Sequence, residues 1–219
     1  MKNIIIFGNG KHSKVVFSEI LKLKEYNILG FIGTSTKRKL IIKYRNKKYF
    51  NLGTSKILKN YSNIYGVIGV GDNHIRKKIH KEINILKKIK WAKIVSKNSV
   101  LNGNVKIGPG SIIVSGSIIN NGTKIGSHCI INTSSSIDHD NVFENFSSTG
   151  PSTTTGGSVK VCQFSHLGIG STIKDGVTIK SNTIIGGKSF VNKDCLKNKI
   201  YFGVPAKEFK DRKLGNSYS

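Results

Sequence analysis

The sequence predicts two structural units, an α/β unit of Rossmann type over residues 1–90 and a parallel β-solenoid with three flat faces over residues 91–207, followed by a tail over residues 208–219. Two observations lead to this prediction. In the first part, short apolar runs alternate with segments of helical periodicity, which is typical of a small parallel sheet covered by helices. In the second part, which is rich in Gly, Ser, Thr, Asn and Ile, an aliphatic residue recurs every six positions.

In the first unit, the apolar run 3–7 predicts a short buried strand, and the Gly8-Asn9-Gly10 segment after it predicts a turn. The remaining elements are expected in this order: a helix over 13–25, a strand over 28–32, a hairpin arm over 43–50, a strand over 65–70 closed by Gly71, and a helix over 73–86. Strands alternating with helices in this way indicate a small parallel sheet.

The six-residue repeat predicts the second unit. Fourteen of its seventeen positions are Ile, Val or Leu. The positions are Val95, Leu101, Ile107, Ile113, Ile119, Ile125, Ile131, Ile137, Phe143, Thr149, Thr155, Val161, Leu167, Ile173, Ile179, Ile185 and Val191. A period of six is too short for helical repeats and suits a solenoid that places one hexapeptide on each of three faces, with the aliphatic residue pointing inward. Glycine and asparagine are expected at its tight corners.

The formal net charge of +25 raises the question of nucleic acid as a partner. The basic residues are scattered among aliphatic residues, as on solvated helix faces, and they form no stripe interleaved with aromatic stacking pairs. We therefore expect no nucleic-acid binding. A positive field of this size would instead help to collect small anionic ligands.

Cysteine usage and hydropathy exclude several other classes. Cys129, Cys162 and Cys195 form no CxxC pair, and neither they nor the histidines have the spacing of metal ligands, so we expect no disulfide framework and no metal. No apolar stretch approaches the ~20 residues that span a bilayer. The N-terminal apolar run ends at Gly8 and is too short for a secretory signal. These features predict a cytoplasmic protein that does not bind membranes.

Four motifs, in order along nearly the whole chain, carry a resemblance to a known family. They lie at residues 5–16, 68–78, 132–140 and 202–207. Together with the hexapeptide register they resemble the hexapeptide-repeat acyltransferases, in the subfamily of sialic acid O-acetyltransferases and N-acetyltransferases of UDP- or GDP-linked 4-amino sugars. The resemblance implies a left-handed β-helix, a homotrimer and acetyl-CoA as co-substrate.

Acetyl transfer from a thioester needs a base that removes a proton from the acceptor, and histidine is the natural choice near neutral pH. By resemblance, the family's catalytic base corresponds to His139, and the carboxylate that raises its basicity corresponds to Asp140. The competing interpretation of His139 is a solvent-facing histidine on the solenoid.

The resemblance also implies a CoA site in a groove between two prisms of the trimer. Gly157, Ile169 and Gly187 would contact CoA, and Lys207 would face nucleotide phosphates. Ser148 stands where the family often carries a second histidine, and His166 is interpreted as structural or solvent-facing. The glycines are equally consistent with corner geometry alone.

The first unit would hold the nucleotide-linked substrate, since backbone N–H groups at a strand-to-helix turn attract phosphate. Gly33-Thr34 replaces the acidic pair that the family commonly carries after the second strand. The substrate-binding residues implied by the resemblance are Gly10, Lys11, His12, Gly33, Thr34, Gly71 and Asn132.

The resulting prediction is an acetyl-CoA-dependent N-acetyltransferase of a nucleotide-linked 4-amino sugar in surface glycan biosynthesis. Two alternatives remain open. One is an O-acetyltransferase of sialic acid or a related nonulosonic acid, which would share the fold and the base. The other is a non-catalytic trimer that binds nucleotide sugars, and the His139–Asp140 pair disfavours it.

Overall fold

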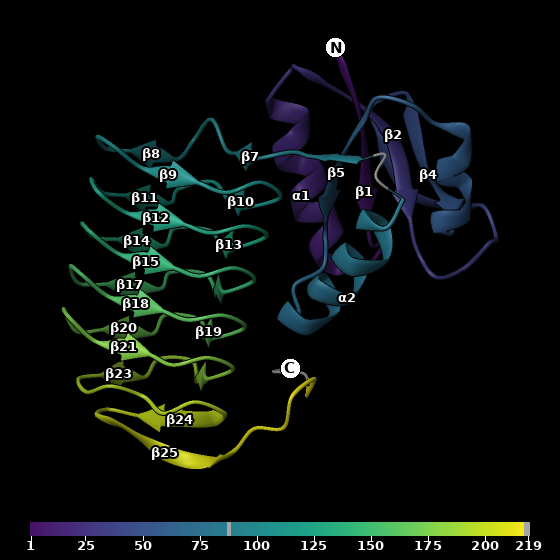
Figure 1. Ribbon diagram of the computed structural model, residues 1–219. Helices are drawn as coiled ribbons and strands as arrows, with labels where there is room; N and C mark the ends of the chain where they lie inside the picture. The colour runs from purple at the N-terminus through teal and green to yellow at the C-terminus, as the bar shows by residue number, and fades with distance from the viewer. Residues whose placement is uncertain (87–88, 217–219) are drawn as a thin grey trace.

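The computed structural model describes residues 1–86 and 89–216 and shows two units side by side, an α/β unit and a prism of stacked coils (Figure 1). The elements of the first unit are β1 (Lys2–Phe7), α1 (Lys11–Lys22), β2 (Tyr26–Ile32), β3 (Lys39–Tyr44), β4 (Lys47–Gly53), η1 (Ser55–Asn60), β5 (Ile64–Ile68), α2 (Asn73–Asn84) and β6 (Ile89–Trp91). No helix in the described ranges is long and apolar enough to cross a membrane.

The six strands of the first unit form one sheet in the order β3-β4-β2-β1-β5-β6. All pairs are parallel except β3 with β4, which form an antiparallel hairpin where a hairpin arm was predicted, so the sheet is mixed. The predicted strands and helices are all present. The first helix ends at Lys22, three residues before its predicted end, and Lys24 beyond it has a φ of 53°, which a right-handed helix cannot accommodate.

The second unit confirms the hexapeptide prediction. Its strands lie in three sheets, and between β7 and β23 neighbouring strands of a sheet are parallel and three strands apart along the chain. They are β7 (Ile94–Val95), β8 (Val100–Leu101), β9 (Lys106–Ile107), β10 (Ile112–Ile113), β11 (Ile118–Ile119), β12 (Lys124–Ile125), β13 (Ile130–Ile131), β14 (Ser136–Ile137), β15 (Val142–Phe143), β16 (Ser148–Thr149), β17 (Thr154–Thr155), β18 (Lys160–Val161), β19 (His166–Leu167), β20 (Thr172–Ile173), β21 (Thr178–Ile179), β22 (Ile184–Ile185) and β23 (Phe190–Val191).

Most of the residues at the six-residue positions lie in the core of the prism, together with residues such as Cys129, Val159 and Val177. Ile113, Ile137 and Ile185 are each 0% exposed and belong to one continuous apolar cluster along the prism axis. Thr149, a polar residue at such a position, is buried as well, and its hydroxyl accepts a hydrogen bond from the backbone N–H of Asn132 at 2.9 Å. The period therefore specifies the inward face even where the residue is not aliphatic.

One corner column of the prism departs from the expected glycine and asparagine. His128, Phe146 and Phe164 occupy successive corners with φ between 55° and 62°. Their rings stack, with centroids 5.1 Å apart for the first pair and 5.8 Å for the second. Aromatic stacking is worth about 0.5–1.5 kcal/mol per pair beyond burial and offsets the cost of left-handed backbone at bulky residues.

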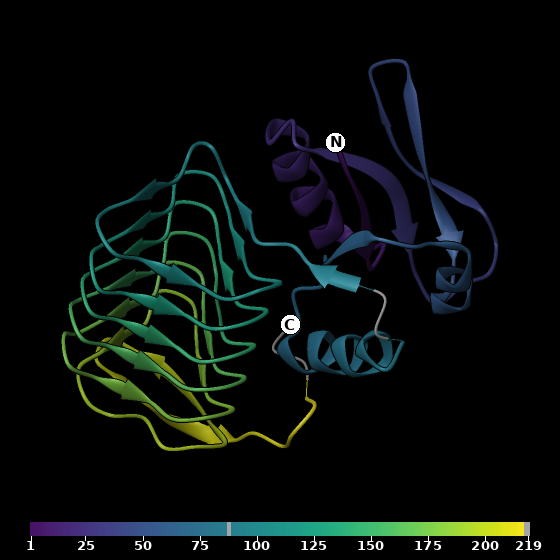
Figure 2. The same cartoon turned by 45° about the horizontal axis from the view of Figure 1, so that its top comes forward.

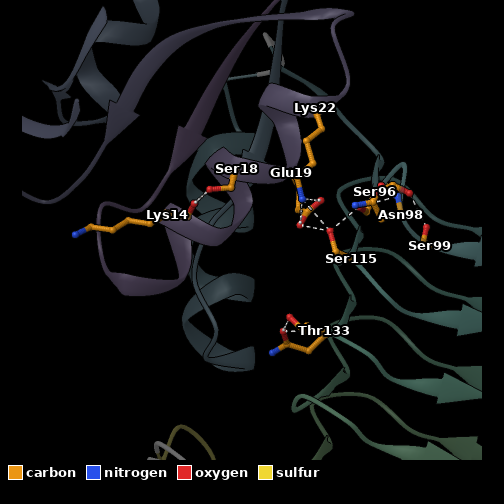
Figure 3. A network of polar contacts seen from close by, with 10 residues as sticks. Lys14, Ser18, Glu19, Lys22, Ser96, Asn98, Ser99, Ser115 and Thr133 are labelled. Carbon is orange, nitrogen blue, oxygen red and sulfur yellow. Dashed lines mark hydrogen bonds and ion pairs between the residues drawn. The ribbon is translucent and has the colours of Figure 1, made fainter. Parts of the chain in front are cut away.

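Helix α2 packs against this column and joins the two units. Arg76 of α2 is 1% exposed and donates hydrogen bonds to the carbonyl oxygens of His128 at 3.0 Å and Phe146 at 3.2 Å. Its neighbour Asn73 donates to the carbonyl of Ser165 at 3.0 Å. A second polar contact joins α1 to the first coils, where the buried Glu19 accepts from Ser115 at 2.7 Å (Figure 3).

The last coil is closed by a hairpin of β24 (Lys199–Gly203) and β25 (Ala206–Asp211). Residues 208–211, assigned to the tail from the sequence, thus continue a strand. Beyond it the chain turns back towards α2 (Figure 2), and Arg212 donates to the side chain of Asn182 at 2.7 Å. The same Asn182 side chain is bonded to His74 of α2, so the chain end ties the base of the prism to the α/β unit.

Candidate active site

His139 and Asp140 lie at the corner between β14 and β15, and their side chains contact each other. The left-handed backbone of Asp140, with a φ of 55°, turns its carboxylate towards the ring, so that Oδ2 lies 2.9 Å from Nδ1 of His139. Asp138 fixes the backbone before the pair, since its carboxylate accepts from the N–H of His139 at 2.8 Å and from Asn120 at 3.0 Å. With the carboxylate accepting from Nδ1–H, Nε2 keeps its lone pair and can accept a proton.

The hydrogen bond that Asp140 accepts raises the pKa of His139, because it stabilises the imidazolium. Burial opposes this shift, but the His139 side chain is 58% exposed and remains accessible to a substrate. The pair therefore places an accessible imidazole of raised proton affinity on the surface of the prism.

Gly157 lies under the His139 ring on the next coil. A Cβ at this position would lie 2.5 Å from both Cε1 and Nε2 of His139. The resemblance implied that Gly157 contacts CoA; the structure places it against the His139 ring, where the absent side chain leaves room for the imidazole.

Gly157→Ala is expected to lower kcat about tenfold or more, because the added methyl displaces the imidazole and small misplacements of a catalytic group are costly. Steady-state kinetics would measure the effect. Ser158→Ala, at the next and exposed position, is the matched control and should leave kcat unchanged. A Gly157→Ala enzyme with full kcat would show that the position of this ring does not matter.

Most of the predicted CoA residues line a groove of about 380 Å³, here called the coil groove. One wall is formed by the outward residues of β13, β16, β19 and β22 and by the corners after them, and the other wall includes His12 and Gly71 of the α/β unit. Ser148, Ile169, Gly187 and Asn132 all line it, whereas Gly157 and Lys207 do not. Lys207 lies exposed on β25.

Ser148 is joined to His166, which the sequence analysis took as structural or solvent-facing. Its hydroxyl donates to Oδ1 of Asn73 at 2.8 Å and lies 2.9 Å from Nδ1 of His166. A hydroxyl has one proton, so His166 is the donor in the second bond. Burial, with the charges of Arg76 and Arg212, lowers the pKa of His166 to about 3 and keeps the ring neutral.

The groove therefore contains a histidine one coil below the position where the resemblance expects one. The signal was available in the sequence: residues 148 and 166 are 18 apart, which is one full coil, and β16 pairs directly with β19. Phe202 also lines the coil groove, and no pattern in the sequence indicated that it would lie there.

A second cavity of about 420 Å³, here called the sheet cleft, lies at the carboxyl ends of β1, β2 and β5. It is lined by the Gly8-Asn9-Gly10 turn, by Gly33-Thr34, by Thr54-Ser55, and by Val70 with Ile75, Ile79, Glu82 and Ile83 on or before α2. The carboxyl ends of parallel strands are where nucleotides bind in open α/β sheets.

Four of the residues implied for substrate binding lie outside the sheet cleft: Asn132, His12, Gly71 and Lys11. His12 and Gly71 line the coil groove, and burial, with the charge of Arg76, lowers the pKa of His12 to about 4. Lys11 is exposed at the start of α1 and lines neither cavity. The two cavities thus lie on either side of the segment from Gly10 to His12.

His139 lines neither cavity. The coil groove follows the face of β13, β16, β19 and β22 and the corners after these strands, whereas His139 lies at the next corner, between β14 and β15. One chain thus holds the base and the coil groove on different corners of the prism.

Comparisons with known proteins agree with this architecture. Residues 3–83 match the family model described as PglD N-terminal domain. A mutant of perosamine N-acetyltransferase from Caulobacter crescentus, solved in complex with CoA and GDP-perosamine, superposes with a TM-score of 0.89 at 25% identity, covering 96% of this chain and 98% of that one.

Two further structures share the fold. The acetyltransferase domain of PglB from Neisseria gonorrhoeae FA1090 has a TM-score of 0.85 at 22% identity and covers 95% of this chain and 100% of its own. WeeI from Acinetobacter baumannii AYE has a TM-score of 0.83 at 18% identity, with the same coverage. The second unit is thus a left-handed parallel β-helix. With its PglD-type N-terminal domain, the chain is similar in architecture to the hexapeptide-repeat sugar acetyltransferases.

Proposed function

We propose that this protein transfers the acetyl group of acetyl-CoA to the amine of a nucleotide-linked 4-amino sugar. The observation that carries the proposal is the His139–Asp140 pair, with 2.9 Å between Nδ1 and Oδ2, in a chain that also has a coil groove and a sheet cleft. The perosamine N-acetyltransferase that it resembles was solved with CoA and a GDP-linked amino sugar.

The reaction follows from these groups. The sugar amine attacks the thioester carbonyl carbon, a C–N bond forms, and Nε2 of His139 takes the proton that the amine loses. The C–S bond then breaks, and the imidazolium returns this proton to the CoA thiolate. The base is regenerated and no acyl-enzyme forms. Asp140 stabilises the imidazolium between these steps.

The pH profile reports this base. Because Asp140 raises the pKa of His139, kcat/KM should rise with pH through a value above the ordinary 6.5, as the imidazolium loses its proton. Asp140→Asn removes the carboxylate, so the acidic limb should move to lower pH and the maximal rate should fall. Asp175→Asn, at an exposed aspartate, should leave the limb in place. Identical limbs in wild type and Asp140→Asn would contradict the role of Asp140.

We infer a homotrimer in which His139 of one subunit faces the coil groove of the next. The inference is supported by the separation of the base and the groove in one chain, since a cyclic assembly brings unlike surfaces together. A mixed assembly tests it. His139→Ala removes the base and Ile169→Trp fills the coil groove, so each variant is expected to be inactive alone. The two subunits would be co-expressed with different tags and purified through both.

Every mixed trimer contains one interface at which an intact base meets an intact groove, so activity should return to about a third of wild type. A complete site within each subunit would leave the mixture inactive.

Since acetyl-CoA and nucleotide sugars are cytoplasmic metabolites, we infer a cytoplasmic enzyme of surface polysaccharide biosynthesis that requires no metal.

The reaction is tested by thiol release from acetyl-CoA with UDP- and GDP-linked 4-amino sugars, free sialic acid and CMP-sialic acid. We expect release with an amino-sugar nucleotide and none with the sialic acids. Release with a sialic acid alone would support the O-acetyltransferase. The absence of thiol release with every compound tested would contradict the proposal.

A further inference from the structure

The sheet cleft has chemically different ends. At one end lies the Gly8-Asn9-Gly10 turn, and a Cβ on Gly8 would lie 2.6 Å from Cγ2 of Val70, so this turn sits beside the chain that leads into α2. Glu82 lies in the last turn of α2, ten residues after the N-cap Asp72. At a rise of 1.5 Å per residue, the ten residues of α2 after Asp72, up to Glu82, span about 15 Å. The two ends of the cleft are therefore separated by about the length of a nucleoside with its phosphates.

The first end suits phosphate. The turn leads directly into α1, which begins at Lys11, and helix N-termini offer backbone N–H groups and a positive dipole to anions. Between the ends, Ile75, Ile79 and Ile83 follow one another at helical spacing on α2 and give the cleft an apolar wall. An apolar wall of this kind packs against the flat face of a nucleobase.

The other end carries a fixed carboxylate. Glu82 is the one acidic residue among the residues that line the sheet cleft. Its Oε1 accepts a hydrogen bond from Ser55, the first residue of η1, at 2.5 Å, which holds the side chain across the cleft. Within the described part of the chain, no ion pair involves Glu82, although the protein carries 36 Lys and Arg against 11 Asp and Glu.

The cleft carries no carboxylate at the end of β2, where the resemblance expects an acidic pair. Gly33 lies there against the side-chain amide of Asn9, and a Cβ on Gly33 would overlap that amide. Asn9 in turn donates to Asn51 at 3.4 Å. The carboxylate that lines the cleft therefore lies on α2 and not at the end of β2.

A carboxylate discriminates between nucleobases by their edges. Guanine presents two adjacent donors, N1–H and the N2 amino group, which match the two oxygens of a carboxylate. Uracil presents a single N–H between two carbonyl oxygens, so a carboxylate can accept one hydrogen bond from it and faces two oxygens that repel it.

We propose that Glu82 accepts hydrogen bonds from N1–H and N2–H of guanine, and that the amino sugar acetylated by this enzyme is therefore carried on GDP. This inference rests on the proposed function for the identity of the sugar, but the nucleotide preference is a property of the sheet cleft alone.

The test is the binding of GDP and UDP to the full-length protein by titration calorimetry, without acetyl-CoA. Wild type should bind GDP at least about tenfold more tightly than UDP, since a good bidentate contact discriminates between bases by about that factor or more. Glu82→Gln should weaken GDP binding about tenfold and change UDP binding less than about twofold. Glu25→Gln, an exposed carboxylate far from the cleft, is the matched control and should change neither.

Equal binding of the two nucleotides, preference for UDP, or an equal effect of Glu82→Gln on both would overturn the inference. Ser55→Ala provides a second variant that keeps the carboxylate and loses its anchor, and it should weaken GDP binding by less than Glu82→Gln does. Because binding is measured without turnover, a Glu82-dependent preference for GDP in a protein that releases no thiol would reject the proposed function and keep the guanine site. Thiol release with UDP-linked sugars alone would keep the proposed function and reject the guanine site.

Discussion

His139→Ala is expected to lower kcat by about 10²–10⁴-fold and to leave the assembly intact, because a general base contributes rate enhancement of this size. The side chain is 58% exposed and fills no part of the core, so its removal should not unfold the prism. Thiol release under saturating substrates measures the loss, and size-exclusion chromatography checks the assembly.

Added imidazole provides an internal control for this variant. If the missing ring is the only defect, imidazole in solution should restore part of the lost rate, because Gly157 leaves an open space where the ring stood. Turnover by His139→Ala at the wild-type rate would remove His139 from the mechanism.

The largest expected effect on stability is that of Arg76→Leu. The guanidinium of Arg76 donates to the carbonyl oxygens of Val70, Gly71, His128, Phe146 and Ser147 and to the side chain of Asn73. Removing it leaves several buried acceptors without a donor, each costing about 1–3 kcal/mol, while the relief of a buried charge offsets part of the loss. We expect a net destabilisation of about 3–5 kcal/mol.

A change of this size should lower Tm by roughly 10 °C, measured by circular dichroism at fixed protein concentration. Lys78→Ala, at an exposed position on the same helix, is the control and should change Tm little. A Tm for Arg76→Leu equal to that of Lys78→Ala would show that the two units do not depend on this contact.

The prism could be predicted from the sequence because its core follows a local pattern: an aliphatic residue recurs every six positions, and this register never slips between Val95 and Val191. The corners were harder to predict. The left-handed backbone of His128, Phe146 and Phe164 is compensated by stacking between coils and by α2, and that compensation exists only after the two units pack.

The candidate site, too, could be predicted from the sequence only in part. The His139–Asp140 pair is adjacent in sequence and could be recognised there. The contact of Gly157 with His139, the bond between Ser148 and His166, and the carboxylate of Glu82 in the sheet cleft all join different coils or different elements. They depend on the stacking of coils 18 residues apart and on the packing of α2 against η1, which no local pattern specifies.

The central claim is transfer of an acetyl group to nitrogen, and the linkage in the product tests it most directly. The enzyme would be incubated with acetyl-CoA and a GDP-linked 4-amino sugar, and the product analysed by mass spectrometry before and after treatment with hydroxylamine. We predict a nucleotide sugar heavier by one acetyl group that survives the treatment, as an amide does. A product that loses its acetyl group, as an ester does, or the absence of any acetylated nucleotide sugar would contradict the account.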